Sequence, residues 1–194
     1  MQYKEQWVLP IGGDFRSMDS EGDISRPLAA RSYEPNGLRL RVPFSALAST
    51  LTLLRKAGRR ESGVLWYGAR DASGNGTVAY VVAPRQRMSW GNYLVSAQAL
   101  TDVVRRLPDP WKPLAQIHSH PGGHVEHSRY DDEMACSRKA LSIVFPFYGR
   151  GTPAFPSEVG VHEWQNEYWH LLDQESAKAR VVLVPGEVAV EDLR

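Results

Sequence analysis

The sequence has little cysteine, little net charge and no long apolar run. Cys136 is the only cysteine among 194 residues, so no disulfide can form within the chain, and we expect a reducing, cytoplasmic compartment. Lys and Arg total 23 against 22 Asp and Glu, a balance that argues against long-range attraction to nucleic acid or an anionic membrane. No apolar run reaches the roughly 18 residues of a membrane span. The first residues, 1–6, also lack the basic-then-apolar pattern of a signal peptide.

Length and composition indicate one globular domain preceded by an arm. Hydrophobic residues make up 42% of the chain and charged residues 23%, which is ordinary globular usage. A chain of this size buries enough surface to fold without disulfides. Residues 1–37 are largely polar, so we expect an irregular arm there, with at most a short strand at 6–11. The domain then covers residues 38–194.

The apolar patterns predict a mixed α+β domain. Residues 38–42 alternate as in a strand, and Phe44, Leu47, Leu51 and Leu54 recur at helical spacing. Residues 63–69 are nearly all apolar, which suits a sheet covered on both faces. The further elements that we expect are a return strand at 77–82, a helix capped by Ser96, a strand at 114–118, a helix from about 129 to 139, a strand at 141–145, a hairpin of 159–164 with 169–172, and a last strand at 180–184. The fold class is therefore α+β, with a largely antiparallel sheet flanked by helices.

The run Gln116-Ile117-His118-Ser119-His120-Pro121 carries the strongest functional signal. His118 and His120 alternate at the end of an expected strand, so both rings point to the same face. Ser128 and Asp131 follow at the expected start of a helix. Two histidines and one carboxylate leave the fourth position of a tetrahedral Zn²⁺ open, which is typical of a catalytic site. Zinc in such a site lowers the pKa of its water to roughly 7.

The pattern His-x-His-Pro, six residues, Ser, two residues, Asp resembles the JAMM motif of the JAB/MPN metalloproteases. That family also has a glutamate before a glycine-containing apolar strand. Glu61 matches it, although one residue rather than the more usual two separates it from Gly63. The resemblance covers about residues 38 to 173. It implies a curved sheet with a long helix on either side, layered as in cytidine deaminases.

The resemblance also implies a role for each site residue. His118, His120 and Asp131 would bind Zn²⁺. Glu61 would act as general base and then as general acid, and Ser128 would donate a hydrogen bond to the carbonyl oxygen where charge develops. By the same resemblance the chain is similar to stand-alone prokaryotic members that work with ubiquitin-like proteins and with E1-like and E2-like enzymes, often in anti-phage defence operons. We therefore expect a zinc-dependent isopeptidase or peptidase that cleaves after the C-terminus of a ubiquitin-like protein.

Several alternatives remain open at this stage. Ser128 and Asp131 also match a capping box, which would compete with metal for the Asp131 carboxylate. His124 or His127 could replace Asp131 and give a three-histidine site, or could contact the substrate. MPN domains also serve as scaffolds, and a zinc hydrolase of another amide, such as a sulfur-carrier adduct, would carry the same ligands.

Two further groups of residues have more than one interpretation. Cys136 is expected to be a small buried residue of the helix rather than a nucleophile. The aromatic residues Trp90, Tyr93 and Trp111 are either packed in the domain or anchors for a partner.

Overall fold

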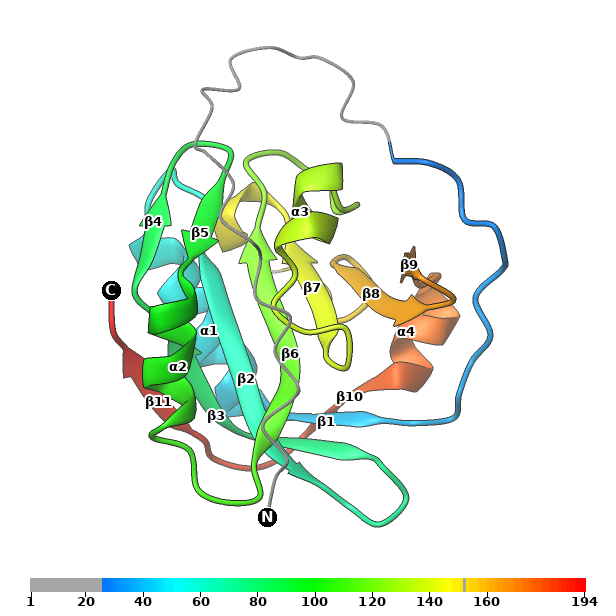
Figure 1. Cartoon of the computed structure of the whole chain (residues 1–194), viewed down its shortest axis with the longest axis horizontal. Helices are drawn as coiled ribbons and strands as arrows, with labels where there is room; N and C mark the ends of the chain where they lie inside the picture. Colours follow the sequence, from blue (N-terminus) through cyan, green and yellow to red (C-terminus); the bar gives the residue numbers. More distant parts are fainter. Residues whose placement is uncertain (1–25, 152) are drawn as a thin grey trace.

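A curled nine-stranded sheet organises the residues that the computed structural model describes, 26–151 and 153–194 (Figure 1). The strands run in the order β10-β1-β3-β2-β6-β7-β8-β9, and β11 pairs with β3 beside β1. Their bounds are β1 Leu40–Pro43, β2 Gly63–Arg70, β3 Gly76–Ala83, β6 Lys112–Ser119, β7 Leu141–Phe145, β8 Gly160–Gln165, β9 Tyr168–Leu171, β10 Val181–Val184 and β11 Ala189–Asp192. This sheet places β6, the expected carrier of the two histidines, near its centre.

The sheet is mixed, with antiparallel pairing predominant among the paired residues. β2 is antiparallel to both β3 and β6, and β8 is antiparallel to both β7 and β9. The parallel pairs are β6 with β7, β1 with β3 and β10, and β11 with β3. The α+β class and the mostly antiparallel sheet predicted from the sequence are therefore confirmed.

Two helices cover opposite faces of the sheet (Figure 1). Helix α1, Phe44–Lys56, packs in one core with Val64 and Trp66 of β2. Helix α2, Ala97–Val104, packs in the other core with Leu65 and Tyr67 of the same strand. Because successive side chains of a strand point to opposite faces, a strand covered on both sides must be apolar throughout. This is why residues 63–69 lack a polar alternation.

The structure departs from the sequence predictions most clearly at three places. Helix α3, Arg129–Met134, ends earlier than the predicted 139. Ala135 leaves the helical region at φ −59° and ψ 120°, and the Cys136 amide instead donates to Gln116 Oε1 at 2.7 Å. Cys136 therefore lies after the helix, and it is buried as expected. The other two differences are elements that the patterns missed, the small sheet of β4 Gln86–Met88 with β5 Tyr93–Val95, and the short helix α4 Gln174–Arg180 followed by β11.

The described part of the arm, residues 26–37, forms neither helix nor strand. It runs beside β8 and β9 (Figure 1, blue). The Tyr33 hydroxyl donates to Glu163 Oε2 at 2.7 Å, and the Glu34 backbone exchanges two hydrogen bonds of 2.8 Å with the Gln165 side chain. The short strand expected at 6–11 lies outside the described residues. In the part of the chain that the structure describes, no helix has the length and apolar character needed to cross a membrane.

Candidate metal centre

Strand β6 places His118 and His120 on the same face of the sheet, one at the end of the strand and one just after it. His118 pairs with Gly63 of β2 on one side and Val144 of β7 on the other. Its side chain is 2% exposed, and that of His120 is 12% exposed. The two Nε2 atoms lie 3.1 Å apart. The expected convergence of the two rings is therefore confirmed.

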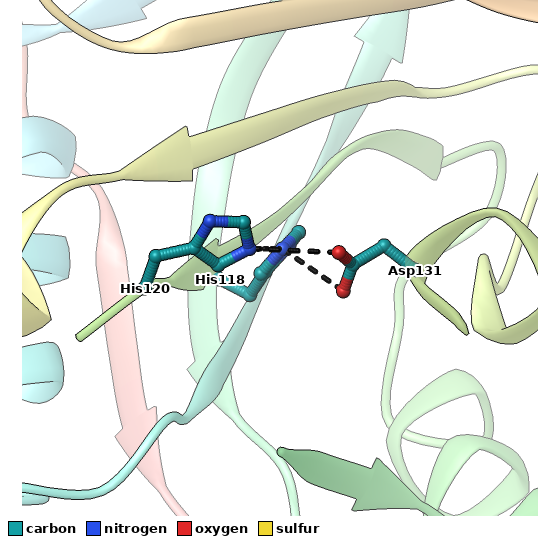
Figure 2. Close-up of side chains that lie close together, drawn as sticks. All are labelled: His118, His120 and Asp131. Atoms are coloured by element: carbon teal, nitrogen blue, oxygen red, sulfur yellow. Dashed lines mark hydrogen bonds and ion pairs between the residues drawn. The ribbon is translucent and has the colours of Figure 1, made fainter. Parts of the chain in front are cut away.

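Helix α3 brings Asp131 to the same point (Figure 2). Its Oδ1 lies 3.2 Å from His118 Nε2, and its Oδ2 lies 3.5 Å from His120 Nε2. Burial alone would raise the pKa of Asp131, but the charge of His118 and hydrogen bonds from both histidines outweigh it and hold this pKa well below its usual range. The carboxylate is therefore ionised and faces both rings.

The three side chains fit a metal ion. In a tetrahedral site with bonds of about 2.0–2.1 Å, neighbouring donor atoms lie about 3.3 Å apart. The separations of 3.1, 3.2 and 3.5 Å bracket that value. His118, His120 and Asp131 offer donor atoms that all lie within 4.8 Å of one another. They supply three corners of a tetrahedron and leave the fourth corner open.

A backbone contact fixes the tautomer of His120. Its Nδ1 lies 3.0 Å from the His124 carbonyl oxygen. Because a carbonyl only accepts hydrogen bonds, Nδ1 carries a proton, and in the neutral ring Nε2 is then the nitrogen that could bind a metal. The His124 side chain itself is 79% exposed, and the candidate ligand group contains His118, His120 and Asp131 without it, so the contribution of His124 in this structure is its carbonyl. The other ligand histidine lacks such a contact: within the described ranges, His118 Nδ1 is buried without a hydrogen-bond partner.

His127 is also not a ligand. Its Nδ1 lies 2.9 Å from Asp132 Oδ1 and its Nε2 lies 2.8 Å from Ser142 Oγ, so both ring nitrogens are occupied. The ring stacks on His162 at 3.9 Å between centroids. Burial holds the pKa of His127 well below its usual value, which keeps the ring neutral. Among the described residues the structure therefore gives the three-histidine alternative no support.

Ser128 and Asp131 form the capping box and the candidate ligand set together. The Ser128 amide and hydroxyl both donate to Asp131 Oδ2 at 2.7 Å, and the Asp131 amide donates to Ser128 Oγ at 3.2 Å. Asp131 Oδ1 is left facing His118. The expected competition for the Asp131 carboxylate is eased because a carboxylate has two oxygens and about four acceptor positions. In this structure the Ser128 hydroxyl serves the cap.

Glu61 is buried beside the cluster, at the entrance to β2. Its side chain has no hydrogen-bond donor among the described residues, and the residue is 5% exposed. Burial raises the pKa of Glu61 to about 8, with the nearby Asp131 charge adding to the rise and His120 opposing it. The Glu61 amide donates to Ser89 O at 2.8 Å, in the turn between β4 and β5. Glu61 is thus within electrostatic reach of the cluster, and its carboxyl exchanges protons close to neutral pH.

The β4–β5 hairpin is the part of the site that the sequence reasoning missed. Gln86 exchanges two hydrogen bonds with the Gly63 backbone, at 2.6 and 2.8 Å. Tyr93 stacks on His118 with 5.5 Å between centroids and 27° between planes. The aromatic run 90–93 was the available signal, but the contact with His118 depends on the docking of the hairpin. The hairpin therefore forms a wall beside the candidate metal ligands.

Comparison with known proteins adds information on the fold alone. No family model matches this chain, and no curated protein matches it significantly. The fold is similar to the solution structure of protein DSY2949 from Desulfitobacterium hafniense, a structural genomics target. The TM-score is 0.56 and the identity 15%, and the match covers 76% of this chain and 94% of that one. At this identity the similarity concerns the fold and carries no activity across.

Proposed function

We propose that this chain is a zinc-dependent amide hydrolase of the JAMM type, an isopeptidase or peptidase that cleaves after the C-terminus of a ubiquitin-like protein. The observation that carries the proposal is the convergence of His118, His120 and Asp131 on an open tetrahedral site, with the buried Glu61 beside them. The curled sheet with α1 and α2 on opposite faces is compatible with the MPN arrangement and supports the same proposal.

The donor set favours zinc. Two imidazole nitrogens and one carboxylate oxygen with an open position are a recurring catalytic zinc environment. When bound, the ion would supply a Lewis acid for the scissile carbonyl and a lowered pKa for the attacking water. The Asp131 charge would balance part of the charge of the ion. Every other part of the reaction depends on the residues of the chain.

Glu61 would move the proton. A base for the attacking water and an acid for the leaving amine are both needed, and one carboxyl can serve as both in turn. Its pKa of about 8 in the metal-free protein would fall once a cation lies beside Asp131, into the range where it accepts a proton near neutral pH. Among the described residues, no donor bonds the carboxyl, so no such contact has to break before it acts. Burial therefore equips Glu61 for both steps.

Ser128 would stabilise the developing oxyanion. Its hydroxyl now donates to Asp131 Oδ2, which also receives the Ser128 amide at 2.7 Å. The hydrogen bond from the Ser128 backbone N–H to Asp131 can hold the cap while the hydroxyl turns to the substrate. A donor aimed at the oxygen that gains charge is worth most in a site that excludes water. This assignment keeps the carboxylate of Asp131 in place during the reaction.

Exposed aromatic rings next to the centre favour a macromolecular substrate. Trp90, in the β4–β5 turn, is 71% exposed, and Phe147 is 54% exposed. The Tyr148 hydroxyl donates to the Trp90 carbonyl at 2.9 Å, and the Tyr148 amide donates to the His120 carbonyl at 2.8 Å. Large rings of this kind are frequent anchors in protein interfaces. Trp111 instead packs against the core under α2, so of the three aromatic residues singled out in the sequence, Trp90 is the candidate anchor.

The test is cleavage of a reporter fused to the C-terminus of a ubiquitin-like protein from the same operon. Zinc-loaded wild-type protein should release the reporter, and Glu61→Ala, which keeps the ligands, should lose at least about 10²-fold of the rate. A short peptide with the same last residues should be a poor substrate because remote binding energy positions the bond. Binding of the fusion without cleavage would favour the scaffold alternative. Cleavage of neither substrate and no binding would favour another amide.

A further inference from the structure

A chain of polar contacts links the arm to the sheet behind the metal centre. Arg26 Nε donates to Asp132 Oδ2 at 2.7 Å. Asp132 Oδ1 lies 2.9 Å from His127 Nδ1, and His127 Nε2 lies 2.8 Å from Ser142 Oγ on β7. None of these residues has a part in the reaction proposed above. The contacts run from residue 26 of the arm, through α3, to the strand next to β6.

Arg26 is held on two further sides. Its Nη2 donates to the Trp169 carbonyl on β9 at 2.7 Å, and its guanidinium carbon lies 4.4 Å from the centre of the Tyr168 ring. The Arg26 side chain is 11% exposed. A planar guanidinium that pairs with a carboxylate, bonds a carbonyl and stacks on a ring uses a geometry that lysine does not reproduce. These contacts place the guanidinium at one point between α3 and β9.

Helix α3 depends on such contacts because apolar packing does not hold it. It has six residues, and none of them is buried. A helix this short is not stable by itself. Its N-terminus is tied by the capping box of Ser128 and Asp131, and the next residue, Asp132, is tied by Arg26 and His127. The candidate ligand Asp131 is therefore held by its own contacts with Ser128 and by the contacts of its neighbour Asp132.

Charge makes Arg26 the critical member of this chain of contacts. Among the described residues, Arg26 is the one lysine or arginine within ion-pair distance of Asp132. The other partner, His127, is held neutral because burial keeps its pKa well below its usual value. Without Arg26 the partly buried Asp132 carboxylate would keep no cationic partner, and an unpaired charge is drawn toward solvent. Movement of Asp132 would carry Asp131 away from the two histidines.

We propose that Arg26 is a positioning residue for the metal centre, acting through Asp132 to hold Asp131 in the ligand triangle. The arm is thereby a working part of the site, although it lies more than 90 residues before the ligands in the chain. The inference rests on the metal-binding part of the proposed function and is independent of the substrate and of hydrolysis. In this proposal the position of α3 determines the position of Asp131.

The experiment compares Arg26→Ala with Arg31→Ala, a matched loss of an exposed arginine on the same arm. Co²⁺ replaces zinc, so that its visible spectrum reports the ligand geometry and its titration gives a Kd. Arg26→Ala should bind Co²⁺ about 10- to 100-fold more weakly, the loss typical of a residue that orients a ligand, with an altered spectrum. Arg31→Ala should match the wild type. The Co²⁺ affinity of Arg26→Lys should fall between those of Arg26→Ala and the wild type, because lysine keeps the positive charge but lacks the planar guanidinium.

A second readout needs no metal. In the metal-free protein, amide hydrogen exchange of Arg26→Ala should accelerate in 128–134 and stay unchanged in the β2 and β6 amides. Unchanged Co²⁺ affinity and spectrum would overturn the proposal, as would faster exchange spread evenly over the domain. If Arg26→Ala fails to fold, Asp132→Ala takes its place with the same expectations, because it removes the contacts with Arg26 and His127 from the α3 side. A wild-type protein that binds no Co²⁺ would also overturn it, whereas metal-loaded protein without peptidase activity would count only against the proposed reaction.

Discussion

Tyr93 lies directly against the Cα of Gly63, in the space that a side chain at Gly63 would fill. The same tyrosine ring stacks on His118. A glycine at the start of β2 is therefore a condition for the contact between the β4–β5 hairpin and the candidate ligand His118. A side chain at residue 63 would displace the Tyr93 ring from the site. Substitution of Gly63 therefore tests this relationship.

Gly63→Ala should destabilise the protein by about 1–3 kcal/mol, the usual cost of forcing an extra methyl group into a packed site. Denaturant unfolding would measure it. Gly91→Ala is the matched control, because a methyl group at Gly91 meets nothing within 4 Å. Equal stability of the two variants would show that Tyr93 moves aside without cost.

Asp131→Asn should lose the metal and keep most of the helix cap. An amide oxygen still accepts from the Ser128 amide, whereas a neutral amide is a much weaker ligand than a carboxylate. Elemental analysis and the melting temperature would separate the two effects. His124→Ala should retain the metal, because His124 contributes only its carbonyl. Full zinc content in Asp131→Asn would remove Asp131 from the ligand set.

The stability of the metal-free protein should depend on Glu61 and pH. The pKa of Glu61 is about 8 in the folded protein against 4.5 for an ordinary glutamate, so between these values the folded state holds one more proton than the unfolded state. Stability from this group is fully present below pH 4.5 and is lost as the pH rises through 8. The unfolding free energy of the wild type relative to Glu61→Gln should fall from pH 5 to pH 8. A constant difference would mean that Glu61 is already ionised.

Ser128→Ala should keep zinc and lose about 10²-fold in turnover if the hydroxyl meets the oxyanion. It should also lose about 1 kcal/mol of stability with the cap. Ser96→Ala removes the hydroxyl that caps α2 by accepting from the Ala99 amide, and it should show the stability loss alone. Comparable turnover in the two variants would limit Ser128 to its role as a cap.

Trp90→Ala should raise KM for a protein substrate by roughly 10-fold or more, the effect of removing an aromatic anchor, with kcat nearly unchanged. Phe44→Ala provides the control, since Phe44 is 55% exposed and begins α1. Kinetics at several concentrations of the fusion would separate the two constants. A fall in kcat with KM unchanged would place Trp90 in the chemistry of the site and not in binding.

The features that the sequence predicted are those set by local periodicity. The alternation of His118 and His120 at a strand end, the spacing of the leucines in α1 and the apolar run of β2 each specify their geometry over a few residues. His127 is different. It sits among the ligands in sequence, yet its ring is withdrawn from the site by Ser142 and by His162, which belongs to the distant β8.

The other features that the sequence did not predict also depend on contacts between distant residues. The end of α3 depends on Gln116, 20 residues before Cys136, and the hairpin is docked by Gln86 on Gly63, 23 residues away. The contact of Arg26 with Asp132 spans 106 residues. Side-chain hydrogen bonds between residues so far apart produce no periodic pattern in the sequence. They can be recognised only from the three-dimensional arrangement of the strands.

The outer edge of β3 is shared by two strands from opposite ends of the domain. β1 pairs with Gly76 and Thr77, and β11 pairs with Tyr80 to Ala83, while β10 pairs with the other side of β1. During synthesis every residue of the metal centre is made before β10 and β11. A ribosome-bound chain would therefore contain all residues of the candidate metal centre while one edge of its sheet is still open to pairing with other strands. Completion of the sheet, and protection from aggregation, would come only once β10 and β11 are made.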